Sequence, residues 1–386
     1  MARVPGKIGY PLIGDESYEF YKDYHAYISK KFEHYGNIFC SRFLNKPTVF
    51  IGTHMGVRQL LNSQSNDLEM GYKSFMDHIF SDNILFASDF EAENLRRDLI
   101  SIFSPQCLEN CEEASFATEI CQTVFLDLDA STAKETAEAI SKLTTSHWHG
   151  LISVPVNLRL PGIKQSGYSK AIDAKNQLLK WIKDRLKTSI KGFPLRMKET
   201  FDEESAASHL LLFSTSLVPK AISSLICSFL LQATAEENFF EKISDQKVFD
   251  AFIKEIYRYY PPILGGRRIA KKDLIIDGYR IPENHSIVYL THSANRDQMI
   301  FENGNTFNYE RWLGDKDKPC IFTFGTSRRN CIGIKMVSII LETTCKLLLK
   351  EFTWTSNAVN DFQYKPLPIS RPVDGYKCRF IPKGTI

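Results

Sequence analysis

The clearest chemistry in this sequence lies around one cysteine near the carboxyl end. Cys331 belongs to the run Phe-Gly-Thr-Ser-Arg-Arg-Asn-Cys-Ile-Gly at 324–333, and an apolar stretch with helical spacing follows it directly. Unpaired backbone N–H groups and the positive end of the helix dipole favour the thiolate form of a cysteine at the start of a helix. A soft thiolate is a natural axial ligand for haem iron and pushes electron density toward O–O cleavage. The alternative is a cysteine simply buried at a helix start.

A carboxylate and a guanidinium lie three residues apart in an apolar helical stretch upstream. Glu255 and Arg258 would share one face of this helix, where they can form a bidentate pair. The stretch ends at Pro261-Pro262, and the run Gly-Gly-Arg-Arg follows at 265–268. On its own, such a pair also fits the solvated face of any helix.

A third segment, Phe-Asn-Tyr-Glu-Arg-Trp at 307–312, lies between the other two. Together, and in this order, the three segments resemble the E-x-x-R, F-x-P-x-R-F and F-G-x-G-x-R-x-C-x-G motifs of the cytochrome P450 superfamily. Tyr309 stands where the second motif has proline. Ser327 replaces the second glycine of the cysteine motif, so the loop backbone there must accommodate a Cβ atom.

The resemblance implies a cofactor and a set of residues that hold it. The cofactor is haem b, with Cys331 as the axial ligand of the iron and Phe324 as a cofactor-binding residue of the same loop. Glu255, Arg258 and Arg311 would form a structural network behind the haem.

Buried haem carboxylates need cationic partners, and the family pattern suggests three arginines for this role. Arg329 lies two residues before the cysteine, Arg268 follows the double glycine, and Arg96 lies in a helical stretch of the first third. Their neighbours Arg97 and Arg267 remain open as rivals, and the alternative for each is a surface arginine.

The long apolar stretch at 210–231 is expected to form a buried helix. In oxygen-activating members of the family the corresponding helix carries an acid and a threonine that relay protons. Here Leu217 stands at the acid position, and Val218 and Pro219 stand at the threonine positions. The acid–alcohol pair is absent, and Pro219, which has no N–H, predicts a kink.

Other groups in this region are weaker candidates for a distal proton donor. The hydroxyls of Thr215 and Ser216 lie one turn earlier, and His209 and Glu204 are the nearest titratable residues. None of them recreates the acid–alcohol pair, so general acid catalysis of O–O cleavage is in doubt.

The amino-terminal segments 5–14, 35–39 and 46–49 resemble the branch of retinoic-acid, abscisic-acid, terpenoid and sterol hydroxylases. This branch implies a lipophilic substrate of isoprenoid, retinoid or sterol type. The middle third of the chain, which would line the pocket, has no such signature.

Three hypotheses about function follow. The first is a haem-thiolate monooxygenase that uses O2 and an external reductase or ferredoxin-type electron donor. The second is an enzyme that rearranges or dehydrates a lipid hydroperoxide or endoperoxide, which requires neither a reductase nor a proton relay. The third is a non-catalytic haem or lipid binder. The missing relay counts against the first and leaves the other two open.

The elements that must position these residues are mostly helices. Helical spacing occurs at 18–35, 55–61, 90–103, 105–125, 133–148, 170–189, 247–260 and 330–352, whereas 35–52, 274–282 and 286–290 read as short strands. No repeat or low-complexity linker interrupts the 386 residues. We therefore expect a single mostly-α domain with small sheets over residues 1–386, the cytochrome P450 fold.

Composition and charge restrict the class of protein further. With 43% hydrophobic and 24% charged residues, the chain is neither disordered nor a small disulfide scaffold. The net charge of +3 is not concentrated in a basic stripe, so nucleic acid is not an expected partner. Nine scattered cysteines, with Cys107 and Cys111 as packing residues, indicate a reducing compartment.

The first residues contain no apolar core long enough for a signal peptide or membrane anchor. The sequence therefore predicts a cytoplasmic protein, or one at the cytosolic face of an intracellular membrane. Any membrane contact of this chain is expected to be peripheral.

Overall fold

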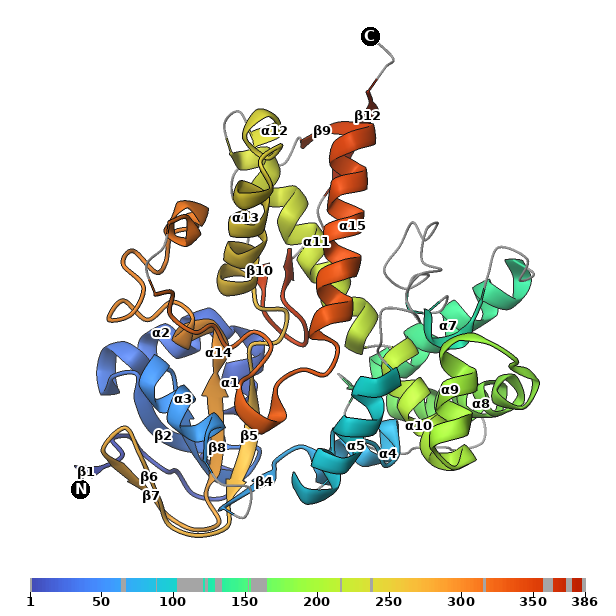
Figure 1. Cartoon of the computed structure of the whole chain (residues 1–386). Coiled ribbons are helices and arrows are strands. Elements are labelled where there is room, and N and C mark those ends of the chain that lie inside the picture. The colour runs from blue at the N-terminus through green and yellow to red at the C-terminus, as the bar shows by residue number, and fades with distance from the viewer. Residues whose placement is uncertain are drawn as a thin grey trace. The chain divides into compact units, whose positions relative to one another are not determined.

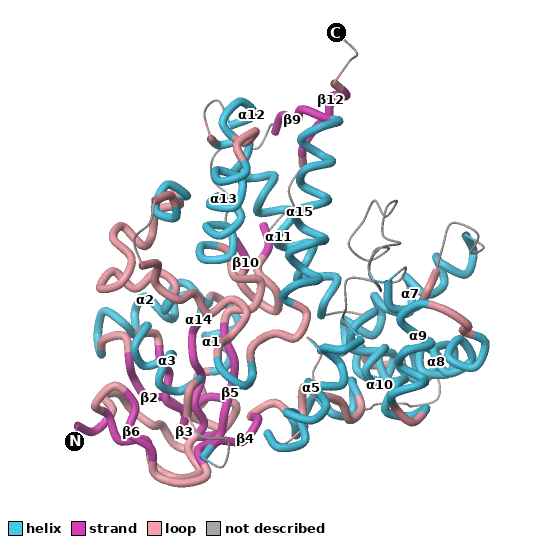
Figure 2. Tube along the Cα trace, viewed as in Figure 1, coloured by secondary structure: helices cyan, strands magenta, loops and turns pink. Residues whose placement is uncertain are grey.

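Helices are the main element of the chain, and the strands form small sheets (Figures 1 and 2). This computed structural model describes residues 2–63, 67–87, 89–102, 121, 124–128, 134–151, 153, 165–215, 217–236, 239–314, 317–356, 364–372 and 377–383. The expected mostly-α architecture with small sheets is confirmed. Most of the helix expected at 105–125, together with Cys107 and Cys111, lies outside the described residues.

The chain divides into two compact units. One comprises Met1–Gly71, Ser224–Ile334 and Ser338–Ile386, and the other comprises Tyr72–Ser223 and Lys335–Val337. The first unit contains the sheets and the three motifs, whereas the second is built from helices. The single domain over residues 1–386 stays a prediction.

The largest sheet of the first unit joins strands from both ends of the chain. Its order is β2-β3-β8-β5-β4, formed by Ile38–Phe43, Lys46–Ile51, Ser286–Leu290, Gly265–Ala270 and Leu68–Met70. Strand β3 runs parallel to β8, whereas the pairs β2-β3, β5-β8 and β4-β5 are antiparallel. The sheet holds residues 265–268, which follow α13 (Gln246–Tyr259), in strand β5 between β8 and β4.

Helices cover both faces of this sheet, which explains its apolar strands. The aromatic side chains of α2 (Tyr24–Tyr35) pack on one face, and Val57 and Leu60 of α3 (His54–Leu61) pack on the other. A strand that is buried on both faces needs apolar residues at successive positions. Phe50 and Ile51, which are adjacent in β3, both have no exposed surface.

The smaller three-stranded sheet contains the expected hairpin. Strands β6 (Leu274–Ile276) and β7 (Tyr279–Ile281) are joined through Asp277 and Gly278, whose φ angles are 48° and 80°. Positive φ at both central residues is the signature of a type I′ turn, which suits an Asp-Gly pair. Strand β1 (Ala2–Arg3) pairs with β7 at the edge.

Helix α13 (Gln246–Tyr259) carries the Glu-x-x-Arg pair. Asp245 caps its first turn by accepting a hydrogen bond from the N–H of Lys247 at 2.8 Å. The helix ends just before Pro261-Pro262, as predicted, because a proline restricts the residue before it to non-helical conformations. Its inward face is apolar apart from Glu255 and Arg258, which are fully buried.

The helix after the cysteine starts later than expected. Helix α15 runs over Ile334–Glu351, so the prediction of a helix from residue 330 is wrong by one turn. A short 3₁₀ helix, η4 (Ser327–Arg329), precedes it, and the N–H of Cys331 donates to the carbonyl oxygen of Phe324 at 2.6 Å. Residues 330–333 therefore close the loop before the helix can begin.

Two short antiparallel pairs follow α15. Strand β9 (Phe352–Ser356) pairs with β12 (Cys378–Pro382), and β10 (Tyr364–Lys365) pairs with β11 (Arg371–Pro372). Residues 364–372 are tied to Ser224 and Ser228 of α11 (Leu217–Ala235), because Ser224 donates to Ser370 O and Ser228 bonds the Tyr364 hydroxyl.

The second unit consists of helices. They are α4 (Lys73–Phe80), α5 (Asp89–Ile102), α7 (Lys134–Leu151), α8 (Gly167–Thr188), α9 (Gly192–Thr200) and α10 (Glu203–Ser214). Helices α7 and α8 pack closely where Gly150 meets Ala171, since a Cβ atom at position 150 would lie only 2.3 Å from the alanine Cβ. The predicted helices at 133–148 and 170–189 are confirmed.

The expected continuous helix at 210–231 is wrong, because the structure divides it. Helix α10 ends at Ser214, Thr215 is extended with φ −107° and ψ −178°, and α11 begins at Leu217. The hydroxyls of Ser214 and Thr215 donate back to the carbonyls of Leu210 and Leu211, a pattern that bends helices.

Pro219 therefore does not produce the kink that the sequence predicted. It lies in the first turn of α11, where a backbone N–H has no acceptor within the helix in any case. The stretch Glu203–Ala235 is long and apolar enough to cross a membrane by length and composition, but 59% of its most apolar window is buried inside the protein. This burial favours a core position, as expected.

Candidate functional site

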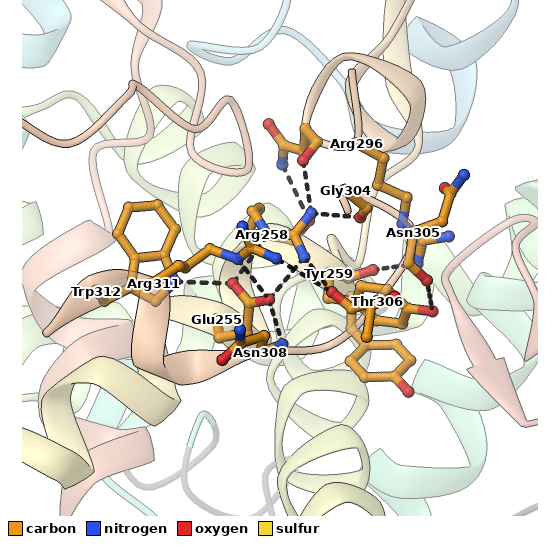
Figure 3. A network of polar contacts seen from close by, with 12 residues as sticks. Glu255, Arg258, Tyr259, Arg296, Gly304, Asn305, Thr306, Asn308, Arg311 and Trp312 are labelled. Carbon is orange, nitrogen blue, oxygen red and sulfur yellow. Dashed lines mark hydrogen bonds and ion pairs between the residues drawn. The ribbon is translucent and has the colours of Figure 1, made fainter. Parts of the chain in front are cut away.

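The first unit contains a fully buried ion pair (Figure 3). The Nε of Arg258 donates to Glu255 Oε2 at 2.8 Å, and Nη2 donates to Oε1 at 2.6 Å. This is the bidentate pair that the spacing on one helix face predicted. Because neither side chain has exposed surface, the charge of Arg258 depends on this carboxylate for compensation.

The remaining donors of Arg258 bind backbone carbonyls of the irregular segment after α14 (Thr291–Ala294). Nη1 donates to Asn295 O at 2.9 Å and to Gly304 O at 2.7 Å, and Nη2 donates to Thr306 O at 2.9 Å. All five N–H groups of the guanidinium therefore have acceptors. One side chain thus orders a segment that has little regular structure of its own (Figure 3).

The carboxylate of Glu255 is equally well satisfied. Beyond Arg258, it accepts hydrogen bonds from the Asn308 N–H at 2.8 Å, Arg311 Nε at 3.2 Å and Trp312 Nε1 at 2.7 Å. The last two residues belong to the 3₁₀ helix η3 (Tyr309–Trp312). The structure thus brings Glu255, Arg258 and Arg311 together as the sequence predicted, and it adds Trp312 and Asn308, which sequence reasoning missed.

Asn295, which sequence reasoning also missed, connects this network to the cysteine loop. Its side chain is fully buried, accepts the N–H of Phe322 at 2.8 Å and donates to Thr323 Oγ1 at 3.0 Å. Thr323 Oγ1 in turn donates to the carbonyl oxygen of Tyr257 in α13. The two residues before Phe324 are thereby fixed against the helix of the ion pair.

The cysteine loop itself is held at both ends. The Phe324 ring packs edge-on against Tyr257, with centroids 4.9 Å apart, and the Phe324 carbonyl accepts the Cys331 N–H. Gly325 and Ser327 have φ angles of 70° and 60°. Ser327 thus occupies the left-handed region where the family motif has glycine, a conformation that costs a residue with a Cβ about 1 kcal/mol.

The loop presents a single exposed thiol, that of Cys331. The described part of the chain has no group of three His, Cys, Asp or Glu side chains that could hold a bare metal ion. A haem iron needs only an axial ligand from the protein, because the porphyrin supplies the equatorial nitrogens. The exposed thiol just before α15 therefore fits haem, whereas a metal ion ligated only by protein side chains would lack partners.

The structure distinguishes Arg268 from its rival Arg267. Arg267 is buried, and it donates to Ser286 Oγ at 2.6 Å and to Gly71 O at 3.2 Å. Alternation along β5 sends Arg268 to the opposite face, where its guanidinium carbon lies 5.5 Å from the centroid of the Tyr289 ring. Arg267 thus supports the unit from inside, and the pairing of Arg268 with a haem carboxylate stays a prediction.

The other two arginines lie at half-buried positions. Arg329 ends η4, two residues before Cys331, and Arg96 lies on α5 in the second unit, where its neighbour Arg97 is exposed. Their pairing with haem carboxylates stays a prediction, as does the role of Phe324.

The distal candidates give no acid–alcohol pair. Thr215 is buried and its hydroxyl is bonded to Leu211 O, whereas Ser216 lies outside the described residues. Leu217 and Val218 are half-buried apolar residues at the start of α11. Both hydroxyls described at this turn, those of Ser214 and Thr215, thus already have acceptors in their own helix.

Neither titratable neighbour replaces the missing acid. His209 is buried and its Nδ1 bonds Ser205 O at 2.8 Å, while Nε2 accepts the Ile84 N–H at 3.1 Å. Burial lowers the pKa of His209, so the ring is neutral. Glu204 pairs with Lys183 at the surface.

Comparison with known proteins relates this chain to one family. The sequence model of the Cytochrome P450 family matches residues 231–380, which contain all three motifs. Human cytochrome P450 26B1 is 24% identical over 97% of this chain and 86% of its own length. The mitochondrial 25-hydroxyvitamin D-1 alpha hydroxylase of Rattus norvegicus is 32% identical over 32% of this chain and 24% of its own length.

Solved structures share the fold over the whole chain. Retinoic acid-bound cyanobacterial CYP120A1 superposes with a TM-score of 0.84 at 17% identity and covers 99% of each chain. P450EX alpha (CYP152N1) with myristic acid gives a TM-score of 0.78 at 18% identity, with 99% of this chain and 100% of that chain covered. The predicted fold is confirmed.

Proteins of this family bind haem b, which is the cofactor that the exposed thiol and its loop fit. The expected resemblance to a retinoid-related branch agrees with the relatives found over nearly the whole chain. The three motifs, the fold and the relatives agree: residues 231–380 match the Cytochrome P450 family model, and the chain has the cytochrome P450 fold.

Proposed function

We propose that this protein is a haem-thiolate monooxygenase that acts on a lipophilic substrate with O2 and an external electron donor. The observation that carries the proposal is the exposed Cys331 thiol in a loop that Asn295 and Tyr257 fix onto the helix of the buried ion pair. Haem b, when bound, supplies the oxidation chemistry. The chain supplies the thiolate and a rigid frame for it.

Each cofactor residue has a defined task in this proposal. Cys331 ligates the iron, and Phe324 packs beside it on Tyr257. Arg329, Arg268 and Arg96 neutralise the haem carboxylates, which would otherwise be buried without a partner charge. Glu255, Arg258 and Arg311 do not touch the reacting atoms but hold the segment that supports the loop.

The substrate class is proposed from similar proteins. Solved structures of this fold are described with retinoic acid, myristic acid and progesterone bound, all of which are largely apolar. An isoprenoid, retinoid or sterol-like substrate is therefore the first choice for assay. The electron donor would be a reductase or a ferredoxin-type protein, and the location the cytoplasm or the cytosolic face of an intracellular membrane.

A second candidate is the reductase-independent rearrangement or dehydration of a lipid hydroperoxide or endoperoxide. The observation in its favour is the missing proton relay. The Thr215 hydroxyl donates to Leu211 O, and apolar residues stand at the acid and threonine positions. A preformed peroxide already contains the O–O bond and requires no delivery of protons to O2.

The first test is the absorption spectrum of the reduced protein with carbon monoxide. Wild type is compared with Cys331→Ser and with Cys320→Ser, which alters another exposed cysteine. We expect a strongly red-shifted Soret band in wild type and in the control but not in Cys331→Ser. The same band in all three proteins would refute ligation by Cys331.

The second test separates the two reactions. Retinoic acid and progesterone are incubated with a reductase and O2, and a fatty-acid hydroperoxide is incubated with neither. Oxidised product that depends on both reductase and O2 supports the monooxygenase, whereas turnover of the hydroperoxide alone supports the second candidate. Ligand binding without turnover in any assay would indicate a non-catalytic binder.

A further inference from the structure

Four polar side chains that the proposed haem chemistry does not use lie together where the first turn of α2 meets α14. Tyr24 and His25 belong to α2, whereas His292 belongs to α14 and Arg296 follows it. The centroid of the His25 ring lies 5.5 Å from that of His292 and 5.4 Å from that of Tyr24, and the rings of Tyr24 and His292 are 6.1 Å apart. We call these four residues the α2–α14 cluster.

Arg296 is the positive charge of this cluster. Burial lowers the pKa of His25 and of His292, and the charge of Arg296 lowers both further, so the two rings are neutral at pH 7. Burial raises the pKa of Tyr24, whereas the Ser293 hydroxyl and the charge of Arg296 lower it. The guanidinium therefore acts on all three rings from nearby.

The charge of Arg296 has little compensation. Nη2 donates to Tyr259 O at 2.6 Å, and the guanidinium carbon lies 3.9 Å from the centroid of the Tyr259 ring (Figure 3). Nε is buried without a hydrogen-bond partner. In the part of the chain that the structure describes, no carboxylate lies within ion-pair distance of Arg296, whereas Glu255 neutralises Arg258. A half-buried cation is thus left without a counter-charge.

The acidic residues next to the cluster in sequence are engaged elsewhere. Asp23, which caps α2, accepts the Ala26 N–H at 3.0 Å. Asp297 accepts the N–H groups of His54 and Met299 at 2.8 and 3.1 Å. Both carboxylates therefore bind backbone donors rather than the guanidinium.

A buried hydroxyl in the cluster also lacks an acceptor. Tyr24 is 3% exposed, and its Oη makes no hydrogen bond. Because Ser293 and Arg296 both act on this hydroxyl, it lies close to the end of α14. A hydroxyl that is buried without a partner carries a desolvation cost, which an oxygen atom of a ligand would remove.

We propose that the α2–α14 cluster binds a phosphate group. The Arg296 guanidinium and the Tyr24 hydroxyl would donate to its oxygens, and each neutral histidine ring has one N–H to donate. Donors from four side chains suit a tetrahedral oxyanion better than a halide ion or a planar carboxylate. Because α2 begins at Tyr24, the positive end of its dipole adds to the attraction.

The burial of the four side chains gives the ligand a way in. His25 is exposed, His292 and Arg296 are half-buried, and Tyr24 is buried. A phosphate group that arrives beside His25 would meet the guanidinium next and the tyrosine hydroxyl last.

A transition-metal ion is the alternative ligand for two adjacent histidine rings. The charge of Arg296 repels a cation, however, and no third His, Cys, Asp or Glu among the described residues completes a metal site here. The unpaired cation and the unpartnered hydroxyl favour an anion.

The experiment is thermal unfolding of the haem-loaded protein in about 10 mM inorganic phosphate and in chloride of equal ionic strength. Wild type is compared with His25→Ala, with Arg296→Gln and with the control His34→Ala, which alters another exposed histidine of α2. We expect phosphate to raise the midpoint of wild type and of the control by roughly 2–4 °C more than chloride does. The shift should be smaller in His25→Ala and absent in Arg296→Gln.

Two further ligands identify what binds. A larger shift with glycerol 3-phosphate than with inorganic phosphate would mean that the cluster takes an organic phosphate, and an equal or smaller shift would mean free phosphate. Both results support the proposal. Zn²⁺ without phosphate tests the metal, and a shift with Zn²⁺ alone that His25→Ala removes would overturn the proposal.

Equal midpoints in phosphate and chloride, or the same phosphate shift in wild type and both cluster variants, would also overturn it. If Arg296→Gln does not fold, His25→Ala still decides, because it alters an exposed side chain. The cluster contains no residue of the cysteine loop, so the proposal can fail while the proposed enzyme function stands.

Discussion

At the residue scale, the buried ion pair of Glu255 and Arg258 is where a single substitution is expected to affect stability most. Removal of Glu255 leaves the charge of Arg258 in the interior without a partner carboxylate, which costs more than the net contribution of the pair. Sequence reasoning found these two residues and Arg311 because their spacing matches a motif. Sequence reasoning assigned no role to Trp312. Nothing in its position showed that its N–H would donate to a carboxylate 57 residues earlier in the chain.

Glu255→Gln is expected to lower the free energy of unfolding by about 3–5 kcal/mol, because Arg258 would lose the one carboxylate that it contacts among the described residues. The matched control is Glu204→Gln, which alters an exposed carboxylate paired with Lys183 and should change stability by less than about 1 kcal/mol. Urea unfolding of both variants measures the difference. Equal effects would contradict the importance of the buried pair.

A second residue, His147, should make stability depend on pH. It is fully buried on α7, its Nε2 bonds Ile79 O at 2.8 Å, and burial lowers its pKa to about 4. The unfolded chain takes up a proton near pH 6.5 and the folded protein does not, so stability falls as the pH drops from 6.5 toward 4. The contribution of this residue reaches about 3 kcal/mol at the lower limit.

His147→Gln tests this dependence, since an amide can still donate to Ile79 O but does not titrate. The variant should lose less stability than wild type between pH 6.5 and pH 4 in denaturant unfolding. Any difference between the two proteins above pH 7 reports packing alone and serves as the baseline. Parallel curves across the acid range would rule out this role for His147.

At the element scale, the sequence located most of the long helices and the strands β2, β3, β6, β7 and β8. It did not predict the other described strands, among them β5, it read residues 18–35 as one helix where the structure has two, and it misplaced two further helix boundaries. Helix α15 starts after residue 333 because residues 330–333 close the cysteine loop, and this closure depends on the distant Phe324 carbonyl. The break between α10 and α11 lies at Thr215 because serine and threonine hydroxyls bond back to the preceding turn. In the sequence, Pro219 was the stronger indication of a kink. In the first turn of a helix, however, a proline removes no helical hydrogen bond.

The side chain of Asn295, which follows α14, holds the segment that leads into the cysteine loop through its hydrogen bonds to Phe322 and Thr323. Asn295→Ala should leave the Phe322 N–H without its acceptor and free the segment that leads into the cysteine loop. In the carbon monoxide spectrum we expect a larger share of an unshifted band, which reports loss of the thiolate ligand. The matched control, Asn83→Ala, removes another buried amide that bonds backbone groups, those of Phe80, Ser81 and Leu85.

The control should lose stability without loss of the red-shifted band. A shift of equal size in both variants would mean that the spectrum follows general destabilisation. In that case Asn295 would have no specific part in the position of the loop.

At the scale of the whole molecule, the division into two compact units could not be predicted from the sequence. No linker, repeat or change in composition marks residue 71 or 223. The first unit is assembled from three separate parts of the chain, so its boundaries depend on contacts between residues far apart in sequence. Such contacts leave no local pattern in the residues that make them.

Because the chain divides into two compact units, we expect it to unfold in more than one step. Trp312 and Trp354 lie in the first unit, and Trp148 and Trp181 lie in the second, so fluorescence can follow each unit separately. In variants that retain the tryptophans of only one unit, we expect different midpoints in urea. Coincident midpoints with equal slopes would instead show the single cooperative domain that the sequence suggested.

The hydrogen bonds of the Arg258 guanidinium also affect how the chain resists proteases. It bonds three carbonyls between residues 295 and 306, a stretch that contains Arg296 and exposed side chains at Gln298 and Met299. While those bonds hold, the stretch cannot extend into the cleft of a trypsin-like enzyme. Cleavage after Arg296 is therefore an early sign that the interior of the first unit has opened, before any change in overall helix content.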